Sequence, residues 1–229
     1  MPQEATGSAT PLSATAADYD LDGLVDVYIC SYVFWRGGSN SAGTRLPIPY
    51  HEAHNGAANI LLKNLGGGRF SNATETSGLD RDNQRFSFAA AWEDYDNDGD
   101  PDLYVANDFG RNNLYRNDIA PGAEPRFVDM AASEGAEDSA SGMSVSWSDY
   151  DRDGLMDLYV SNMFSAAGSR VTRQDSFKPR ASEQVRKRLQ RFARGNTLLR
   201  RGGNGFEDVL SLIHISEPTR PERIGVGVV

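Results

Sequence analysis

The stretch DYDNDGDPD, from Asp94 to Asp102, decides the fold. It recurs in register as DYDLDGLVD from Asp18 to Asp26 and as DYDRDGLMD from Asp149 to Asp157. Each copy places aspartates at positions 1, 3, 5 and 9 and a glycine at position 6. A single stretch of this kind is as typical of a solvated acidic turn as of a binding site, but three copies in register favour a common role.

Four carboxylates around a tight turn are the donor set of Ca²⁺, which takes about six to eight oxygen ligands, and a backbone carbonyl at position 7 would add another. Without a cation, like charges about 4 Å apart repel by roughly 4 kcal/mol at an effective dielectric of about 20. We therefore expect the loops to need metal for order, with one Ca²⁺ ion per loop and about three in all. The predicted ligands are Asp18, Asp20, Asp22, Leu24 and Asp26; Asp94, Asp96, Asp98, Asp100 and Asp102; and Asp149, Asp151, Asp153, Leu155 and Asp157.

The residues beside the loops predict strands rather than helices. A helix–loop–helix calcium site needs a glutamate at loop position 12, and this chain has Ile29, Val105 and Val160 there. The loops are followed by VYICS, LYVAN and LYVSN, and the second and third are preceded by FSFAAAW and GMSVSW. These are short β-branched and aromatic runs that end in polar residues, so each loop is predicted to join two adjacent strands.

A second pair of predicted strands follows each loop, which gives four strands per unit. The aligned positions are Asn59, Asn112 and Asn196, then Leu61, Leu114 and Leu198, then a turn, then Phe70, Phe127 and Phe206. Repeated four-strand units with a glycine and aromatic signature are typical of propeller blades. Insertions at 32–58 and 163–195 both fall between the second and third strands, so we expect them on one face.

The units resemble FG-GAP repeats of the VCBS type, the calcium-binding blades of integrin alpha chains and of many bacterial secreted proteins, and more narrowly the cartilage acidic protein family. The resemblance covers about residues 13–209 and is carried by the DxDxDGxxD loops, by LYVAN and LYVSN, and by the NxLxRN and GxGxF-like turns. The first unit lacks the tryptophan that precedes the other two loops, and the second has DIAPGAEPR instead of a glycine-rich turn. The resemblance implies an all-β fold, a partial β-propeller of about three four-stranded blades with calcium loops on one rim and one short helical insertion.

The expected organisation follows these units. Residues 1–12 are a disordered or truncated start, 13–80 the first blade with its insertion, 81–136 the second, 137–209 the third with a basic helical insertion, and 210–229 a tail outside the fold. LSLIHISEPTR, from Leu210 to Arg220, resembles the translation of a sequencing-library adapter; a true terminal strand is the alternative. Because propellers close with about four to eight blades, we expect the remaining blades of a longer parent chain as partners.

The segment from Arg170 to Arg201 is basic, with 11 basic and two acidic residues. A helix is predicted over 182–194 within it. Its signals are the N-cap Ser182, the apolar stripe Val185, Leu189 and Phe192, and the terminal Gly195. We expect this helix to dock by its stripe; recruitment of an anionic polymer, or bracing of a neighbouring acidic rim, stays open.

The charge and the apolar content of the chain limit the partners that it can have. The net charge is −9, and 13 of the 32 acidic residues lie in the three loops, so the acidity argues against a nucleic-acid partner. No run of 18 apolar residues exists to span a membrane. The single Cys30 has no partner for an internal disulfide and is expected to be buried as a small hydrophobe.

Catalytic motifs are scarce, with no nucleophile elbow, Cys–His pair or phosphate loop. The sequence therefore predicts a non-enzymatic, calcium-binding propeller scaffold that binds extracellular protein or glycan, and that is secreted, periplasmic or at the cell surface. The alternative is that these are non-catalytic blades of a secreted carbohydrate-active enzyme, a polysaccharide lyase or hydrolase.

Overall fold

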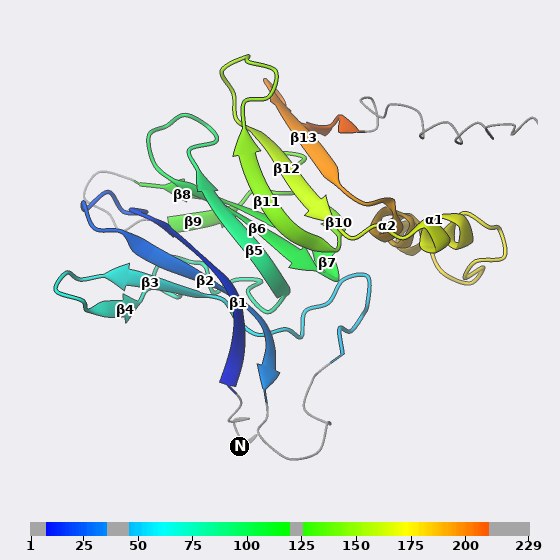
Figure 1. The fold of residues 1–229 in the computed structure, drawn as a ribbon, viewed down its shortest axis with the longest axis horizontal. Helices are drawn as coiled ribbons and strands as arrows, with labels where there is room; N and C mark the ends of the chain where they lie inside the picture. Colours follow the sequence, from blue (N-terminus) through cyan, green and yellow to red (C-terminus); the bar gives the residue numbers. More distant parts are fainter. Residues whose placement is uncertain (1–7, 36–45, 120–125, 211–229) are drawn as a thin grey trace, which may run out of the picture.

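The computed structural model describes residues 8–35, 46–119 and 126–210, which form three four-stranded antiparallel sheets (Figure 1). The first sheet contains β1 (Ser8–Ala17), β2 (Asp26–Trp35), β3 (Ile60–Asn64) and β4 (Phe70–Asn72). The second contains β5 (Phe86–Glu93), β6 (Asp102–Asp108), β8 (Asn113–Asp118) and β9 (Arg126–Asp129). The third contains β11 (Gly142–Ser148), β12 (Asp157–Asn162), β13 (Thr197–Gly202) and β14 (Gly205–Asp208). A two-stranded pair joins β7 (Gly110–Arg111) to β10 (Ser139–Ala140).

Each four-stranded sheet runs in chain order, so every strand pairs with its neighbours in sequence. The prediction of an all-β fold built from antiparallel sheets is confirmed, and none of the described sheets closes on itself. The expected start at 1–12, the insertion at 32–58 and the tail at 210–229 fall partly or almost wholly outside the described residues.

Two apolar clusters lie between neighbouring sheets. In the first, Tyr28 and Leu61 of the first sheet pack with Leu103 and Val105 of the second. In the second cluster the second sheet uses its other face, where Tyr104 packs with residues of the third sheet. Full burial of each large apolar side chain contributes roughly 1.5–3 kcal/mol, so these layers carry most of the stability of the stack. Cys30 lies in the first cluster at 0% exposure, which confirms its expected burial.

The aligned asparagines perform the same task in all three sheets. Each side-chain Oδ1 accepts a hydrogen bond from a backbone N–H of the second strand, two residues beyond the last residue that pairs with the third strand. The bonds run from Ser31 to Asn59 (2.8 Å), from Asn107 to Asn112 (2.8 Å) and from Asn162 to Asn196 (2.9 Å). The amide thus satisfies a backbone donor where the ladder between the second and third strands stops.

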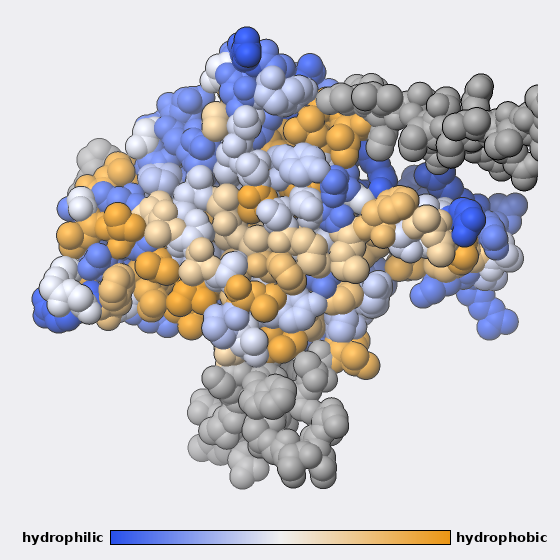
Figure 2. Space-filling view, in the orientation of Figure 1, coloured by the Kyte–Doolittle hydropathy of each residue, from blue (hydrophilic) through white to orange (hydrophobic). Residues whose placement is uncertain are grey.

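The acidic loops and the insertions lie at opposite ends of the sheets. In Figure 1 the β1–β2, β5–β6 and β11–β12 connections follow one rim, and the helices and β7 lie at the other. This follows from the meander, because the first connection leaves one end of a sheet and the second connection leaves the other. In Figure 2 hydrophilic residues gather at the top of the view, over the β11–β12 loop.

One helix was predicted in the insertion at 163–195, and that prediction is incomplete because two are present. The predicted helix is α2 (Glu183–Arg194), with the Oγ of Ser182 accepting from the N–H of Val185 at 3.3 Å and with Gly195 at φ 95° after its end. The additional helix is α1 (Ala166–Thr172), capped by Ser165. Its seven residues carry no apolar stripe, so it depends on packing against α2, including a bond from Gln190 Nε2 to the Thr172 carbonyl at 3.1 Å.

The helix α2 docks through both apolar and charged groups. Phe192 is buried, and Val185 and Leu189 are half-buried. Three of its arginines also pair with acids outside the helices: Arg188 with Glu52, Arg191 with Asp138 (2.7 Å) and Arg194 with Asp208 (2.9 Å). Part of the basic charge is therefore used within the chain.

Candidate metal sites

Each acidic loop has the same backbone, with two residues in the left-handed region. Position 4 is Leu21 (φ 57°), Asn97 (φ 62°) or Arg152 (φ 64°), and position 6 is a glycine with φ between 86° and 98°. A non-glycine residue pays about 1–2 kcal/mol for this conformation, which asparagine tolerates better than leucine or arginine. Strain of this kind persists where the surroundings hold it, commonly at functional sites.

The carboxylate at position 1 holds the turn in shape. In the first loop, Asp18 accepts backbone N–H groups from Asp22 (3.0 Å) and Gly23 (2.8 Å). The same pair of bonds is made to Asp94 (3.1 and 3.0 Å) and to Asp149 (3.1 and 3.1 Å). These bonds fix the orientation of the carboxylate at position 1 relative to positions 5 and 6 of each loop.

The carboxylate at position 9 closes the loop onto the sheet. In the second loop, Asp102 accepts the N–H of Tyr95 at 3.1 Å and the N–H of Asn117, on β8, at 2.8 Å. Asp26 and Asp157 make the equivalent bonds, and all three residues are buried at 0–1% exposure. Position 9 therefore ties the loop to the third strand of its own sheet.

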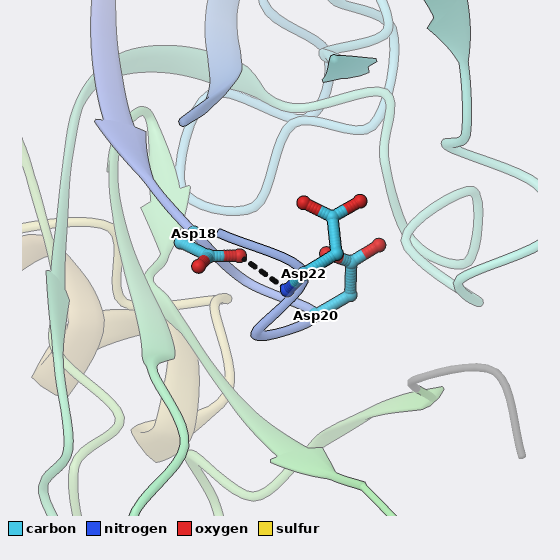
Figure 3. A group of neighbouring side chains, drawn as sticks. All are labelled: Asp18, Asp20 and Asp22. Carbon is cyan, nitrogen blue, oxygen red and sulfur yellow. Dashed lines mark hydrogen bonds between the residues drawn. The ribbon is translucent and has the colours of Figure 1, made fainter. Parts of the chain in front are cut away.

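Three acidic triads result, each with ligand oxygens within 4.8 Å of one another. They are Asp18, Asp20 and Asp22; Asp94, Asp96 and Asp102; and Asp149, Asp151 and Asp157. Figure 3 shows the first triad on one turn of chain, with the dashed bond from the Asp22 backbone to the Asp18 carboxylate. The carboxylates at positions 1 and 3 belong to the triad in every loop. The third member is the carboxylate at position 5 in the first loop and at position 9 in the second and third loops.

The remaining predicted ligands lie outside these triads. Asp26, Asp98 and Asp153 belong to the same loops but to no triad. Asp100 turns its Oδ2 to the N–H of Ile119 at 3.2 Å. The position 7 carbonyls of Leu24, Asp100 and Leu155 remain predicted ligands.

Burial and mutual repulsion raise the pKa values of five of the loop carboxyls. Desolvation is the largest cause for Asp102, whose pKa rises to about 8, with Asp96 and Asp100 adding like charge. Desolvation also raises the pKa of Asp100 to about 6. The pKa values of Asp26, Asp96 and Asp157 are raised for the same reasons. A bound cation would favour the ionised carboxylates and offset this cost.

The second loop also fits a hard cation through its unused acceptors. Asp100 is 6% exposed, and its Oδ1 has no hydrogen-bond partner among the described residues; the same is true of the buried Oδ1 of Asp96. Buried carboxylate oxygens are normally satisfied by donors or by a metal ion. An all-oxygen donor set suits Ca²⁺ or Mg²⁺ rather than Zn²⁺.

The first triad differs from the others in having a cation of its own. The Nζ of Lys63, on β3, contacts the Asp20 carboxylate and lies 3.7 Å from Asp22. Arg116 and Arg200 occupy the same register position on β8 and β13, but they pair with Asp118 and Glu207. This basic position is not among the predicted site residues, although it recurs two residues after each aligned leucine.

Residues 94–160 match the FG-GAP-like repeat. The matched segment begins at the second acidic loop and ends in β12, just after the third, so it contains two of the three triads. No curated protein matches the chain. None of the helices in the described residues is long and apolar enough to cross a membrane.

Proposed function

We propose that the chain is a calcium-binding β-propeller scaffold without catalytic activity, which binds protein or glycan outside the cytoplasm. The observation that carries the proposal is the threefold recurrence of one loop. In each sheet the same connection has the same two left-handed residues, the same two bonds to position 1 and a triad of carboxylates. The FG-GAP-like repeat at 94–160 supports the propeller assignment.

Calcium is favoured over magnesium by the character of the sites. Ca²⁺ accepts irregular sets of carboxylate and carbonyl oxygens, whereas Mg²⁺ requires near-ideal octahedral geometry and keeps several waters. Short exposed loops of this type suit the affinity of extracellular modules, with Kd on the order of 10⁻⁴–10⁻³ M. Such affinity would leave the sites empty at cytosolic calcium levels, and this is the basis for placing the protein outside the cytoplasm.

The recognition surface is proposed at the rim opposite the calcium loops. There, backbone bonds hold the insertion after β2: Ala53 N–H to the Phe109 carbonyl (2.7 Å) and Gly56 N–H to the Gln84 carbonyl (2.8 Å). Glu52 pairs with Arg85 (3.6 Å) and with Arg188 of α2. Both insertions are thus fixed to one platform, so they can present a defined surface to a protein or glycan.

Calorimetric titration of the full chain with CaCl₂ tests the metal assignment. We expect a stoichiometry of about three with millimolar to submillimolar affinity. Asp20→Asn, Asp96→Asn and Asp151→Asn should each remove one site, while Asp175→Asn, an exposed aspartate outside the loops, should remove none. If millimolar calcium neither releases heat nor raises the unfolding temperature, the scaffold is not a calcium protein.

Incubation with polysaccharides tests the non-catalytic assignment. We expect retention of a glycan or protein ligand on the immobilised chain without release of unsaturated or reducing sugar. Release of such sugar would instead favour a carbohydrate-active enzyme.

A further inference from the structure

The two faces of each sheet have different chemistry, and the three sheets use them in the same order. One face, here called the tyrosine face, carries the tyrosine of loop position 2, a tyrosine on the second strand and a leucine on the third. It consists of Tyr19, Tyr28 and Leu61 in the first sheet; Tyr95, Tyr104 and Leu114 in the second; and Tyr150, Tyr159 and Leu198 in the third.

The tyrosine face is buried in the first two sheets and open in the third. All six residues of the first two sheets are 0–2% exposed. In the third sheet Tyr150 is 41% exposed, Tyr159 is 38% exposed and Leu198 is half-buried. The residues are of the same type, so the difference comes from the absence of a sheet packed against them among the described residues.

The opposite face of each sheet, here called the aliphatic face, shows the reverse pattern of burial along the three sheets. In the second and third sheets it is buried, at 0–8% exposure, and consists of Leu103, Val105, Tyr115 and Phe127, and of Leu158, Val160, Leu199 and Phe206. The equivalent residues of the first sheet are Val27, Ile29 and Leu62, which are half-buried, and Phe70, which is 46% exposed. The open aliphatic face is therefore at one end of the stack and the open tyrosine face at the other.

Inside the chain, a tyrosine face packs on the aliphatic face of the following sheet twice. We propose that the open tyrosine face of β11–β14 binds the open aliphatic face of β1–β4 in a second copy of this chain, so that copies associate head to tail. The two internal interfaces show which residues would meet in this contact, because equivalent residues occupy the open faces.

A hydrogen bond seen inside the chain could also form between two copies. In the interface between the first and second sheets, the Nδ2 of Asn117 donates to the backbone carbonyl of Tyr19 at 2.8 Å; the third sheet has Arg201 at the position of Asn117. Asn64 has the same place in the first sheet, since its N–H also bonds to the position 9 aspartate. Asn64 of one copy would therefore donate to the backbone carbonyl of Tyr150 of the other.

One feature of the internal interfaces is missing from the first sheet. The internal interfaces contain the indoles of Trp92 and Trp147, whose ring centroids lie 6.3 Å from Tyr28 and 6.1 Å from Tyr104. The open tyrosine face has a hollow at this place, lined by Ser146, Ser148, Tyr150, Asp157, Tyr159 and Leu198. The residue of the first sheet in the same register is Ala16. Association between copies therefore lacks an aromatic contact that both internal interfaces have.

This gap gives a gain-of-function test by analytical ultracentrifugation of the full chain in millimolar calcium. The wild type should associate reversibly with concentration. Ala16→Trp should tighten association roughly two- to tenfold, because an aromatic pair contributes about 0.5–1.5 kcal/mol beyond area burial and each 1.4 kcal/mol is a factor of ten. Adding Tyr159→Glu should abolish the gain, whereas Val171→Glu, at an exposed position of α1, should leave it intact.

A mixing experiment tests the head-to-tail arrangement. Tyr159→Glu blocks only the tyrosine face and Leu62→Glu blocks only the aliphatic face, so each variant alone should be monomeric. Their mixture should form a dimer and no larger assembly. The Tyr159→Glu variant keeps an intact aliphatic face and the Leu62→Glu variant keeps an intact tyrosine face, so only one contact can form. Such unlike faces make a heterologous contact, which otherwise builds rings or filaments.

Circular dichroism confirms that each variant is folded before it is used. The proposal is overturned if the wild type and Ala16→Trp stay monomeric at high concentration, or if the two blocked variants fail to pair. Dimerisation of Leu62→Glu alone would also overturn it, since that result means pairing of two tyrosine faces.

Discussion

The ammonium group of Lys63 contacts the carboxylate of Asp20, inside the first acidic triad. An incoming calcium ion has to displace this charge or share the site with it. Unit charges about 4 Å apart interact by roughly 4 kcal/mol at an effective dielectric of about 20. The first loop is therefore expected to bind calcium most weakly of the three.

Lys63→Gln should raise the calcium affinity of the first loop by about tenfold or more, since it removes a competing cation. Calorimetry in a background of Asp96→Asn and Asp151→Asn isolates that loop. The matched control is Arg116→Gln, measured with the first and third loops silenced, because Arg116 forms its ion pair with Asp118 outside the triad and acts on Asp96 only as a neighbouring charge. Equal gains in the two loops would show that general charge, not the Lys63 contact, sets the affinity.

Positions 5 and 9 of a loop should differ in what they contribute. Asp102→Ala removes the acceptor of two buried backbone N–H groups, so it should destabilise the protein by about 2–4 kcal/mol with or without calcium. Asp98→Ala leaves those bonds in place. Its cost should be the lost metal linkage, about 1.4 kcal/mol when free calcium is about ten times Kd.

Denaturant unfolding of both variants in calcium and in chelator separates these contributions. In chelator, Asp98→Ala should lose only the bond that its Oδ1 accepts from the Asp100 N–H at 3.2 Å, so it should stay close to the wild type. A similar loss for the two variants under both conditions would contradict the division of roles.

The stability of the metal-free protein should depend on pH in the direction set by its raised carboxyl pKa values. The pKa of Asp102 is about 8 and that of Asp100 about 6, above the value of about 3.9 expected in the unfolded chain. Between about pH 4 and pH 8 the folded state therefore binds more protons than the unfolded state, so its stability falls as pH rises. Calcium binds the ionised carboxylates, so the affinity for calcium should rise over the same range.

Thermal unfolding in chelator and in calcium, over about pH 5 to pH 8, checks this behaviour. The unfolding temperature should decline with pH in chelator, and the stabilisation by calcium should grow. A metal-free protein that becomes more stable toward pH 8 would contradict the raised pKa values.

Cys30 should be chemically silent in the folded protein. It is fully buried in the first apolar cluster, and desolvation raises the pKa of its thiol to about 11. Because the thiolate is the reactive species, a thiol reagent at about pH 8 should label the native chain far more slowly than the chain in denaturant. Fast labelling of the native protein would mean that the first and second sheets separate readily.

Much of the fold could be predicted because the chain repeats itself. The period-two pattern of LYVAN and the fixed asparagine and phenylalanine positions place each strand, and a meander then follows from short connections. The helix α1 could not be found in this way, since its seven residues have no apolar periodicity and depend on α2. The short pair β7–β10 likewise depends on a tertiary contact, as Asn112 N–H bonds to the Asp138 carbonyl at 2.9 Å.

The sequence predicted which aspartates form the candidate sites, but it did not predict the different role of each loop position. Spacing alone gives aspartates at positions 1, 3, 5 and 9 equal weight. The structure separates them, because the positive φ of positions 4 and 6 brings positions 1 and 3 together while Asp102 and its equivalents turn toward the third strand. Lys63 was missed because its contact with Asp20 joins residues far apart in sequence.

The separation of the acidic loops from the insertions has a consequence for how such chains can change. A residue added after β2 or β12 lengthens the chain at the far end of its sheet and shifts none of the aspartates. Foreign peptides of varied length could be carried at those two places, while the opposite edge keeps its shape.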